Sequence, residues 1–247
     1  MLEHVLNLGN QLKTDLDTSE GFSSVDYEKI VIVGMGGSGV AGDVLKLILN
    51  QYTNIDVEVR KTYNLTKTQI AARPFCLFIS YSGNTEETIS AAKNAIDENL
   101  EWAAISSGGE LLDLATKYNK KFVKVPDGLQ PRAAFGLMTK AVVNYLPNQT
   151  KKIFINACEE AGNYLNNLTE DASNEVFEIS KDIANQIGSK TAVIYAGSDL
   201  TYLVAQRWKT QINENSKSKA YVGFMPEVHH NEICLLYTSP SPRDSIR

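Results

Sequence analysis

Hydroxyl-bearing side chains are concentrated in one short stretch of the sequence, Ser80-Tyr-Ser-Gly-Asn-Thr85. The stretch follows a continuous apolar run at 75–79 and precedes a helical pattern that begins near Thr85. Serine and threonine hydroxyls donate hydrogen bonds, glycine permits a tight turn, and the first N–H groups of a helix are further donors. Open α/β sheets bind ligands at the carboxyl ends of their strands, so Ser80, Ser82 and Thr85 are candidates for binding a phosphate group.

Helix capping offers a simpler explanation for the end of this stretch. Either Asn84 or Thr85 could cap the following helix, with a partner in the first helical turn. We expect such a cap to form, but it does not account for the hydroxyls of Ser80 and Ser82. The stretch contains no lysine or arginine, which suits a phosphate monoester that has to be released after each turnover.

A glycine-rich stretch, Gly34-Met-Gly-Gly-Ser-Gly39, also lies between an apolar run and a helical pattern. It fits the G-x-G-x-x-G spacing of dinucleotide sites, but such sites expect an acidic residue near the end of the second strand. Arg60 and Lys61 stand there instead and would suit only a 2′-phosphate. Glycines let backbone N–H groups approach an anion, and Ser38 adds a hydroxyl. We therefore favour an anion site over a turn without a ligand, and a nicotinamide cofactor is left as an alternative.

Apolar runs alternate with helical patterns along the first 148 residues. Continuous apolar runs of this length are typical of strands buried on both faces of a parallel sheet. The alternation predicts a doubly wound parallel α/β sheet with helices on both faces. The expected strands are 29–33, 55–59, 75–79, 102–105 and 122–125. The expected helices are the N-terminal segment to about Leu16, 40–49, 85–99, 111–118 and 131–145.

A second α/β lobe is expected after the segment Pro147-Asn-Gln-Thr150. Its expected elements are helices at 153–168 and 175–187, a strand at 191–195, a glycine turn at 197–199 and a helix at 200–213. We predict a first domain at 1–148 and a second at 149–234, which has fewer strands and is therefore incomplete. Residues 235–247 lack periodicity and contain two Ser-Pro steps. They resemble a translated cloning adapter, so we expect a non-native tail.

Composition narrows the class of protein. The net charge of −5 argues against nucleic acid as a partner, because phosphate backbones require a basic surface. The three cysteines are widely spaced and favour a reducing compartment over a disulfide framework or a zinc site. The N-terminus has no signal-peptide pattern, and no apolar run reaches the length of a bilayer span. We therefore expect a cytoplasmic protein that binds neither nucleic acid nor membrane.

Four parts of the sequence together resemble the bifunctional phosphoglucose/phosphomannose isomerase family, which is built from two sugar isomerase (SIS) domains. They are the Gly-Gly-Ser-Gly39 turn, Ser80-Tyr-Ser-Gly-Asn-Thr-Glu-Glu-Thr88, Pro131-Arg-Ala-Ala-Phe-Gly136, and Asn213-Glu-Asn-Ser-Lys217 with His230-Asn-Glu232. The hydroxyl-rich loop is shared by all SIS proteins, whereas the Pro-Arg stretch and the Glu and His residues narrow the match to this family. The resemblance runs from the first strand to about residue 233 and implies two flavodoxin-like lobes.

The resemblance also implies which residues contact a substrate. The implied phosphate ligands are Ser38, Ser80, Ser82 and Thr85. Gly36 and Gly37 would bring the backbone close to the sugar. Arg132 would stabilise charge on an enediolate near C1 and C2, Glu214 would move a proton between C2 and C1, and His230 would assist ring opening.

Each of the last three residues also has an explanation without chemistry. Glu214 could be a solvated carboxylate at a helix end. Arg132 could be a surface arginine, although the first turn of a helix is electrostatically unfavourable for a cation and hints at an anionic partner. The pair His229-His230 could suggest a metal, but it lacks the i, i+4 spacing of a helical zinc site, so no metal is expected.

The activity implied by the resemblance is the interconversion of glucose 6-phosphate, and of mannose 6-phosphate, with fructose 6-phosphate through an enediol, with no cofactor. It also implies a homodimer with active sites at subunit contacts. The family has a further catalytic lysine in a C-terminal segment, and this sequence ends before that segment; Lys217 and Lys219 do not match that lysine.

One alternative is a non-catalytic SIS sensor of sugar phosphates, which would need no Glu214, Arg132 or His230. Another is a related transferase, which would need a glutaminase domain.

Overall fold

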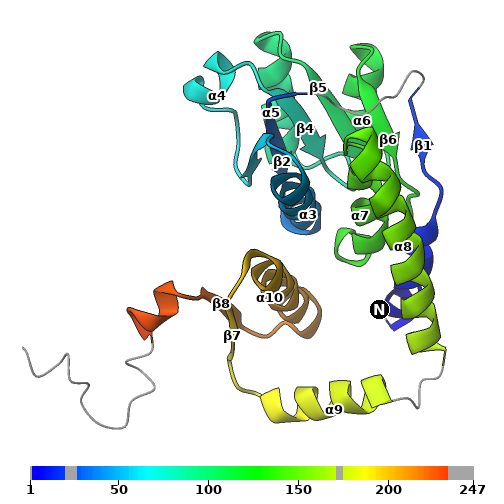
Figure 1. The fold of residues 1–247 in the computed structure, drawn as a ribbon, viewed down its shortest axis with the longest axis vertical. Helices are drawn as coiled ribbons and strands as arrows, with labels where there is room; N and C mark the ends of the chain where they lie inside the picture. The colour runs from blue at the N-terminus through cyan, green and yellow to red at the C-terminus, as the bar shows by residue number, and fades with distance from the viewer. Residues whose placement is uncertain (1, 20–26, 171–174, 233–247) are drawn as a thin grey trace, which may run out of the picture. The chain divides into compact units, whose positions relative to one another are not determined.

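The chain folds into two compact units, Met1–Lys181 and Asp182–Arg247, and each is considered by itself. The structure is a computed structural model that describes residues 2–19, 27–170 and 175–232 (Figure 1). No helix in these described ranges combines the length and the apolar character that crossing a membrane requires.

The first unit is built on a six-stranded sheet with the order β1-β6-β5-β4-β2-β3. The strands are β1 (Asp17–Thr18), β2 (Lys29–Gly34), β3 (Asp56–Arg60), β4 (Phe75–Ile79), β5 (Trp102–Ser106) and β6 (Lys121–Lys124). Only the short edge strand β1 is antiparallel to its neighbour. Numbered along the chain from β2, the parallel strands have the spatial order 2-1-3-4-5 of flavodoxin-like folds. The predicted parallel α/β sheet is therefore confirmed.

Helices precede the sheet strands, connect β2 to β6, and follow β6 along the chain. They are α1 (Leu2–Leu6), α2 (Leu8–Lys13), α3 (Gly36–Tyr52), α4 (Lys67–Ala71), α5 (Glu86–Asp97), α6 (Gly109–Lys117), the 3-10 turn Pro131–Ala133, α7 (Phe135–Val143) and α8 (Asn148–Thr169). The N-terminal helical segment is shorter than predicted, because the chain turns at Thr14 to pair β1 with β6. The short helix α4 was not predicted. The helix expected at 131–145 begins instead as the 3-10 turn, and α7 starts only at Phe135.

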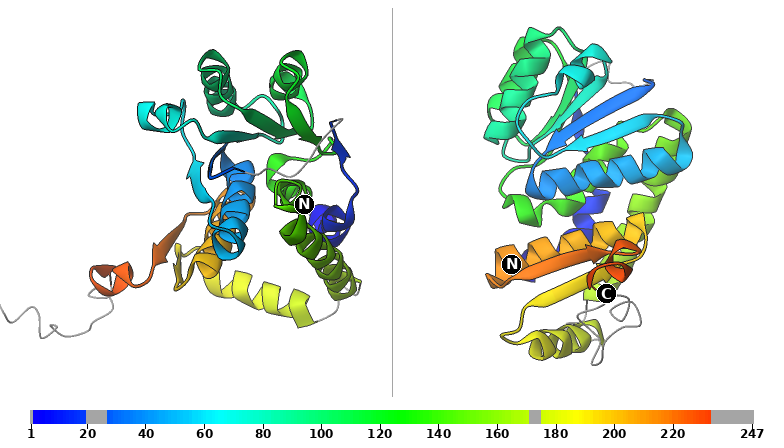
Figure 2. Two further views of the ribbon diagram at one scale, coloured as in Figure 1. Left: turned by 45° about the horizontal axis from the view of Figure 1, so that its top comes forward. Right: turned by 90° about the vertical axis from the view of Figure 1, so that its left-hand side faces the viewer.

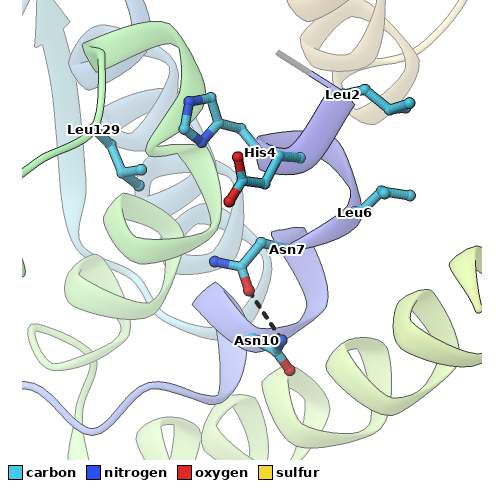
Figure 3. A pocket seen from close by; sticks show the side chains of 7 residues that line it. Leu2, His4, Leu6, Asn7, Asn10 and Leu129 are labelled. Atoms are coloured by element: carbon cyan, nitrogen blue, oxygen red, sulfur yellow. Dashed lines mark hydrogen bonds between the residues drawn. The ribbon is translucent and has the colours of Figure 1, made fainter.

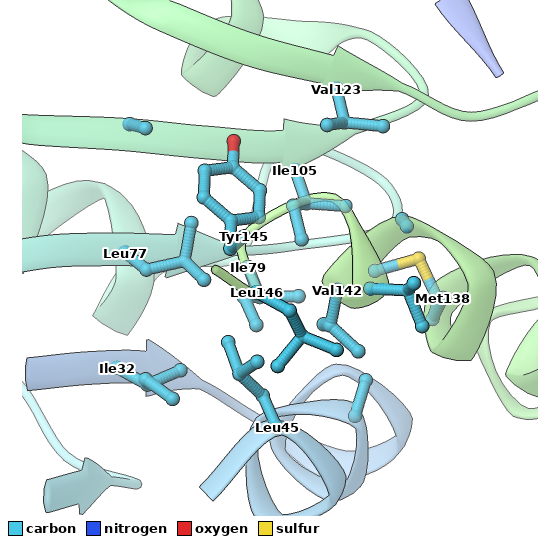
Figure 4. Close-up of a cluster of buried hydrophobic side chains, with 14 of the residues drawn as sticks. Ile32, Leu45, Leu77, Ile79, Ile105, Val123, Met138, Val142, Tyr145 and Leu146 are labelled. Atoms are coloured by element: carbon cyan, nitrogen blue, oxygen red, sulfur yellow. The ribbon is translucent and has the colours of Figure 1, made fainter. Parts of the chain in front are cut away.

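Alternate residues of the central strands form two hydrophobic cores, one on each face of the sheet. The core against α3 and α7 includes Ile30, Ile32, Leu77 and Ile79. The core against α5 and α6 includes Val31, Val33, Cys76 and Phe78. Figure 4 shows the first of these, where the buried Tyr145 donates its phenol O–H to the Ala104 carbonyl at 2.9 Å. The period-two burial therefore places α3 and α5, which follow neighbouring strands, on opposite faces.

Helix α8 belongs to the first unit because it packs on α2 (Figure 2). Small residues allow this approach: a Cβ added at Gly9 would lie 2.5 Å from the Gly162 carbonyl oxygen. The first compact unit thus extends beyond residue 148, where the sequence places a boundary between SIS domains. That division into domains stays a prediction.

The second unit contains a single parallel strand pair in its described part. Strand β7 (Ala192–Ala196) pairs with β8 (Ala220–Phe224), and α10 (Asp199–Gln211) with the π-helical turn Ile212–Ser216 connects them. Helix α9 (Glu175–Ile187) crosses the division between the units, and the 3-10 turn Glu227–His229 follows β8. The predicted strand and helix are confirmed here. The predicted tail, 235–247, lies outside the described residues.

Cys76 gives a test of the core around β4. Its side chain is fully buried, and burial raises the pKa of the thiol to about 12. Because the thiolate is the reactive species, we expect Cys76 to resist iodoacetamide at pH 9 in the folded protein and to react once urea unfolds it. Mass spectrometry of the Cys76 peptide measures both rates. Equal labelling in the two states would contradict this burial.

Candidate active site

The two loops that carry the predicted phosphate ligands lie side by side at the carboxyl edge of the first sheet. Gly34 at the end of β2 is the register partner of Ile79 at the end of β4. The helices that follow these strands, α3 and α5, leave on opposite faces of the sheet. This is the topological switch point, where open α/β sheets bind their ligands.

Ser38 connects the glycine loop to the hydroxyl-rich loop. Its Oγ accepts a hydrogen bond from the Tyr81 N–H at 3.1 Å, and the side chain is buried. Gly36 has a φ of +49°, which favours glycine, and a Cβ added at Gly37 would lie 3.0 Å from the Pro131 carbonyl oxygen. The glycine loop therefore lies against both the hydroxyl-rich loop and the turn that carries Arg132.

The hydroxyl-rich loop is held by bonds within it. The Ser80 and Thr85 hydroxyl oxygens lie 2.8 Å apart, and Ser80 Oγ also accepts from the Gly83 N–H at 3.1 Å. Ser80 is buried, whereas Ser82 is exposed and accepts from the Asn84 N–H at 3.2 Å. The loop thus brings Ser80 and Thr85 together and leaves Ser82 on its outer side.

The expected helix cap is wrong. Thr85 is the N-cap residue of α5, but its side chain makes no cap hydrogen bond in the described structure, because the hydroxyl meets Ser80. The Asn84 carboxamide accepts from the Glu110 N–H at 3.1 Å instead. Helix α3, whose N-cap is Met35, likewise has no side-chain cap bond among the described residues. Two helix N-termini at the switch point therefore offer N–H donors and positive partial charge to an anion.

The basic pair at the end of β3 has protein partners. Lys61 Nζ lies 2.6 Å from Asp43 Oδ2, and Arg60 NH2 donates to Thr62 Oγ1 at 3.3 Å. Arg60 NH1 also lies 3.8 Å from Glu58 Oε1. The cations that would suit a 2′-phosphate are thus engaged by neighbouring side chains.

Arg132 lies in the 3-10 turn after β6 and is half-buried. The structure brings this turn to the glycine loop through the close approach of Pro131 to Gly37. Two buried side chains that sequence reasoning missed, Gln11 and Tyr81, contact the chain on either side of the turn. Neither has a sequence signal of its own, because a lone glutamine in a helical pattern and a tyrosine among serines are both common.

The predicted residues of the second unit lie at opposite ends of one strand. Glu214 is half-buried in the π-helical turn that precedes β8, and His230 is exposed just after the 3-10 turn that follows it. The five residues of β8 span about 16 Å at ~3.3 Å per residue. The second unit therefore places Glu214 and His230 on segments that flank opposite ends of this strand.

Ionisable groups near each end of β8 have shifted pKa values. Burial lowers the pKa of Arg207 on α10, and the negative charge of Glu214 opposes that shift. On the other side, burial and the charge and hydrogen bond of Glu232 raise the pKa of Tyr195 on β7. Arg207 is a further polar group near the predicted base, and nothing in the sequence pattern singles it out.

A surface pocket of the first unit contains none of the predicted site residues. Figure 3 shows this pocket, which is lined by Leu2, Glu3, His4, Leu6, Asn7, Asn10 and Leu129. Across the described ranges, no group of three or more His, Cys, Asp or Glu side chains could hold a metal ion.

Comparison with known proteins identifies the family. A model of the SIS domain matches residues 25–118, and a model described as bacterial phospho-glucose isomerase C-terminal SIS domain matches residues 178–246. A curated relative from Caldicellulosiruptor bescii, named bifunctional phosphoglucose/phosphomannose isomerase, is 35% identical over 94% of this chain and 71% of its own length. The chain belongs to the bifunctional phosphoglucose/phosphomannose isomerase family.

Not every relative of this isomerase family member has the same name. A protein from Sulfolobus acidocaldarius, named D-glucosamine-6-phosphate 4-epimerase, is 35% identical over 86% of this chain, which spans 65% of that relative's length. Among solved structures, one titled putative phosphosugar isomerase from Silicibacter pomeroyi matches with a TM-score of 0.66 at 13% identity, covering 98% of this chain and 73% of that one. The second likeness supports the fold alone.

Gly83 gives a test of the hydroxyl-rich loop. It has a φ of +70°, and an added Cβ would lie 1.7 Å from the Gly108 carbonyl oxygen. Gly128 has a φ of +87° with open space around it, so Gly128→Ala is a matched control. We expect Gly128→Ala to lower the free energy of unfolding by about 1–2 kcal/mol and Gly83→Ala by roughly 3–5 kcal/mol. Urea unfolding measures both, and equal losses would contradict this packing.

Proposed function

We propose that this chain is an aldose–ketose isomerase that interconverts glucose 6-phosphate and mannose 6-phosphate with fructose 6-phosphate. One observation carries the proposal: at the switch point the Ser80 and Thr85 hydroxyls meet, and the Ser38 hydroxyl bonds the adjacent Tyr81 N–H, beside two helix N-termini that have no side-chain cap in the described structure. A phosphate monoester is the anion that such a neutral, donor-rich site suits. The family to which the chain belongs makes a sugar phosphate the preferred source of that group.

The remaining chemistry needs a cation and a base near the other end of the sugar. Isomerisation moves a proton between C2 and C1 and builds negative charge on the oxygens of an enediolate. In our proposal Arg132 stabilises that charge, Glu214 transfers the proton and His230 assists ring opening. Gly36, Gly37 and Ser82 complete the contacts to the sugar phosphate.

A homodimer and a cytoplasmic location are part of the proposal. Since Glu214 and His230 lie at opposite ends of β8, a dimer would let each of them serve a different active site. The Cys76 and Cys158 thiols are free, which fits a reducing compartment.

The proposal is tested by assaying the purified chain with both aldose phosphates and measuring fructose 6-phosphate. Glucosamine 6-phosphate is included because one relative is named for an epimerisation of that sugar. We expect fructose 6-phosphate from at least one aldose. Product from neither would reject the isomerase.

Glu214→Gln separates an isomerase from a sensor. We expect the substitution to lower kcat by about 10²–10⁴-fold, because it removes the proton-transferring carboxylate, while the affinity for glucose 6-phosphate changes little. Glu175→Gln, on the exposed side of α9, is the control and should leave kcat unchanged. Steady-state kinetics and calorimetric titration measure both quantities. Full turnover by Glu214→Gln would remove Glu214 from the mechanism.

Ser80→Ala tests the phosphate contact. Removing a hydroxyl that binds an anion costs about 1–3 kcal/mol, so we expect an increase in the dissociation constant of glucose 6-phosphate of roughly tenfold or more. Ser90→Ala is the control, since the Ser90 hydroxyl donates to Asn64 Oδ1 at 2.9 Å on the exposed side of α5. Equal affinity in both variants, measured by calorimetry, would place the phosphate elsewhere.

A further inference from the structure

The segment from Pro126 to Leu137 carries Arg132, and its two ends are held by side chains from other parts of the first unit. Within this segment the only regular structure before α7 is the 3-10 turn Pro131–Ala133. An arginine that has to meet developing charge needs a fixed backbone, because misplacement by an ångström can lower a rate by about 10²-fold. What fixes this segment therefore bears on the proposed role of Arg132.

Tyr81 holds the first end. Its phenol donates to the Pro126 carbonyl at 2.9 Å and accepts from the Leu129 N–H at 3.0 Å. The side chain is buried, and burial raises the pKa of the phenol, which therefore keeps the proton that it donates. The same residue donates its N–H to Ser38 Oγ and accepts from the Ser107 N–H at 3.0 Å. One tyrosine thus ties the segment to three loops of the carboxyl edge.

Gln11 holds the second end from helix α2. Its Nε2 donates to the Ala133 carbonyl at 2.9 Å, and its Oε1 accepts from the Gly136 N–H at 3.0 Å. The same oxygen lies 3.4 Å from the Leu137 N. The N-cap residue of α7, Ala134, has no side chain that could make a cap hydrogen bond, so the glutamine satisfies these amide groups from outside the helix.

The bonds of Gln11 stabilise the start of α7, and they also fix where that start lies. Gln11 is 2% exposed at a contact between helices, so its side chain has little freedom to move. A buried amide is costly unless its hydrogen bonds are made, and here they are made only to the segment that carries Arg132. A Cβ added at Gly136 would lie 2.6 Å from Gln11 Cβ, so a glycine at that position is what lets α2 come this close.

We propose that Gln11 and Tyr81 are positioning residues for Arg132: each holds one end of the segment 126–137, and together they set the arginine relative to the phosphate loop. The inference rests on the proposed isomerase function. Gln11 lies outside residues 25–118, which the SIS family model matches, so this part of the site comes from the N-terminal helices.

Gln11→Met tests the second end, with Gln69→Met as its control. Gln69 is also buried and also serves a helix N-terminus, where its Oε1 accepts from the Thr66 N–H at 2.8 Å, but it belongs to α4. We expect Gln11→Met to lower kcat about tenfold or more, with KM changed less than about twofold, and Gln69→Met to leave both unchanged. Because Gln11 acts through the arginine, Gln11→Met should lower kcat no further in an Arg132→Ala background.

Tyr81→Phe tests the first end, with Tyr145→Phe as its control. Both substitutions remove a buried phenol that donates to a carbonyl at 2.9 Å, but the acceptor is Pro126 of the segment for Tyr81 and Ala104 of β5 for Tyr145. Tyr81→Phe keeps the backbone bonds to Ser38 and Ser107. We expect kcat to fall in Tyr81→Phe alone, with the affinity for inorganic phosphate unchanged in both variants.

The outcomes separate this inference from the isomerase proposal. Suppose that the unaltered chain turns over sugar phosphate. If kcat of the variants then matches that of their controls, or if the loss of kcat in a variant adds to that of Arg132→Ala, the positioning role is wrong and the isomerase proposal stands. If the unaltered chain has no turnover, the isomerase fails, and hydrogen exchange of the Gly136 and Leu137 amides decides whether Gln11 holds the segment. Faster exchange in Gln11→Met than in Gln69→Met supports the hold, and equal exchange overturns it.

Discussion

The hydrogen bond from the Tyr81 N–H to Ser38 Oγ joins the two loops on which the candidate site depends. It can form only because β2 and β4 are neighbours in the sheet, with Gly34 beside Ile79, although forty-odd residues and strand β3 separate them along the chain. The strand order therefore creates the site, and each loop alone would be an ordinary turn. Once joined, the buried hydroxyls of Ser38 and Ser80 are fixed before any ligand arrives, so binding an anion orders little that is not already ordered.

The two helices at the switch point begin without a side-chain cap in the described structure, as α2, α6, α7 and α8 also do. Helices α4 and α10 begin with complete capping boxes, at Thr66 and Ser198. At the switch point α3 and α5 lack a side-chain cap in the described structure, although each such bond stabilises a helix by about 1 kcal/mol. Thr85 is chemically able to cap α5 and bonds Ser80 instead. An anion bound between the two helices would restore what the missing caps leave unsatisfied, which is a physical reason to expect one there.

The sequence predicts those parts of the fold that depend on local patterns. The apolar run 75–79 coincides with β4, because a strand buried on both faces needs no polar alternation. Helix α4 could not be predicted, since five residues carry too little periodicity. The candidate phosphate ligands could be named from residue type and from their placement at strand ends. The sequence did not reveal that Thr85 bonds Ser80 in place of capping α5, or that Gln11 reaches the start of α7, because both depend on how the chain folds in three dimensions. Such contacts have no local signature.

In the second unit, too, the sequence did not reveal how the predicted residues are arranged in space. Glu214 and His230 are sixteen positions apart and read as one catalytic pair in the sequence, yet strand β8 stands between them. A parallel strand reached through a crossover helix begins at one edge of the sheet and ends at the other, so the segments that directly precede and follow it lie at opposite edges. Glu214 lies where α10 ends, near Arg207, and His230 lies where the ligand edge of a parallel sheet is expected. In the proposed mechanism both act on substrate, and their placement beyond opposite ends of β8 is a physical reason, besides the family resemblance, to propose an assembly of two chains.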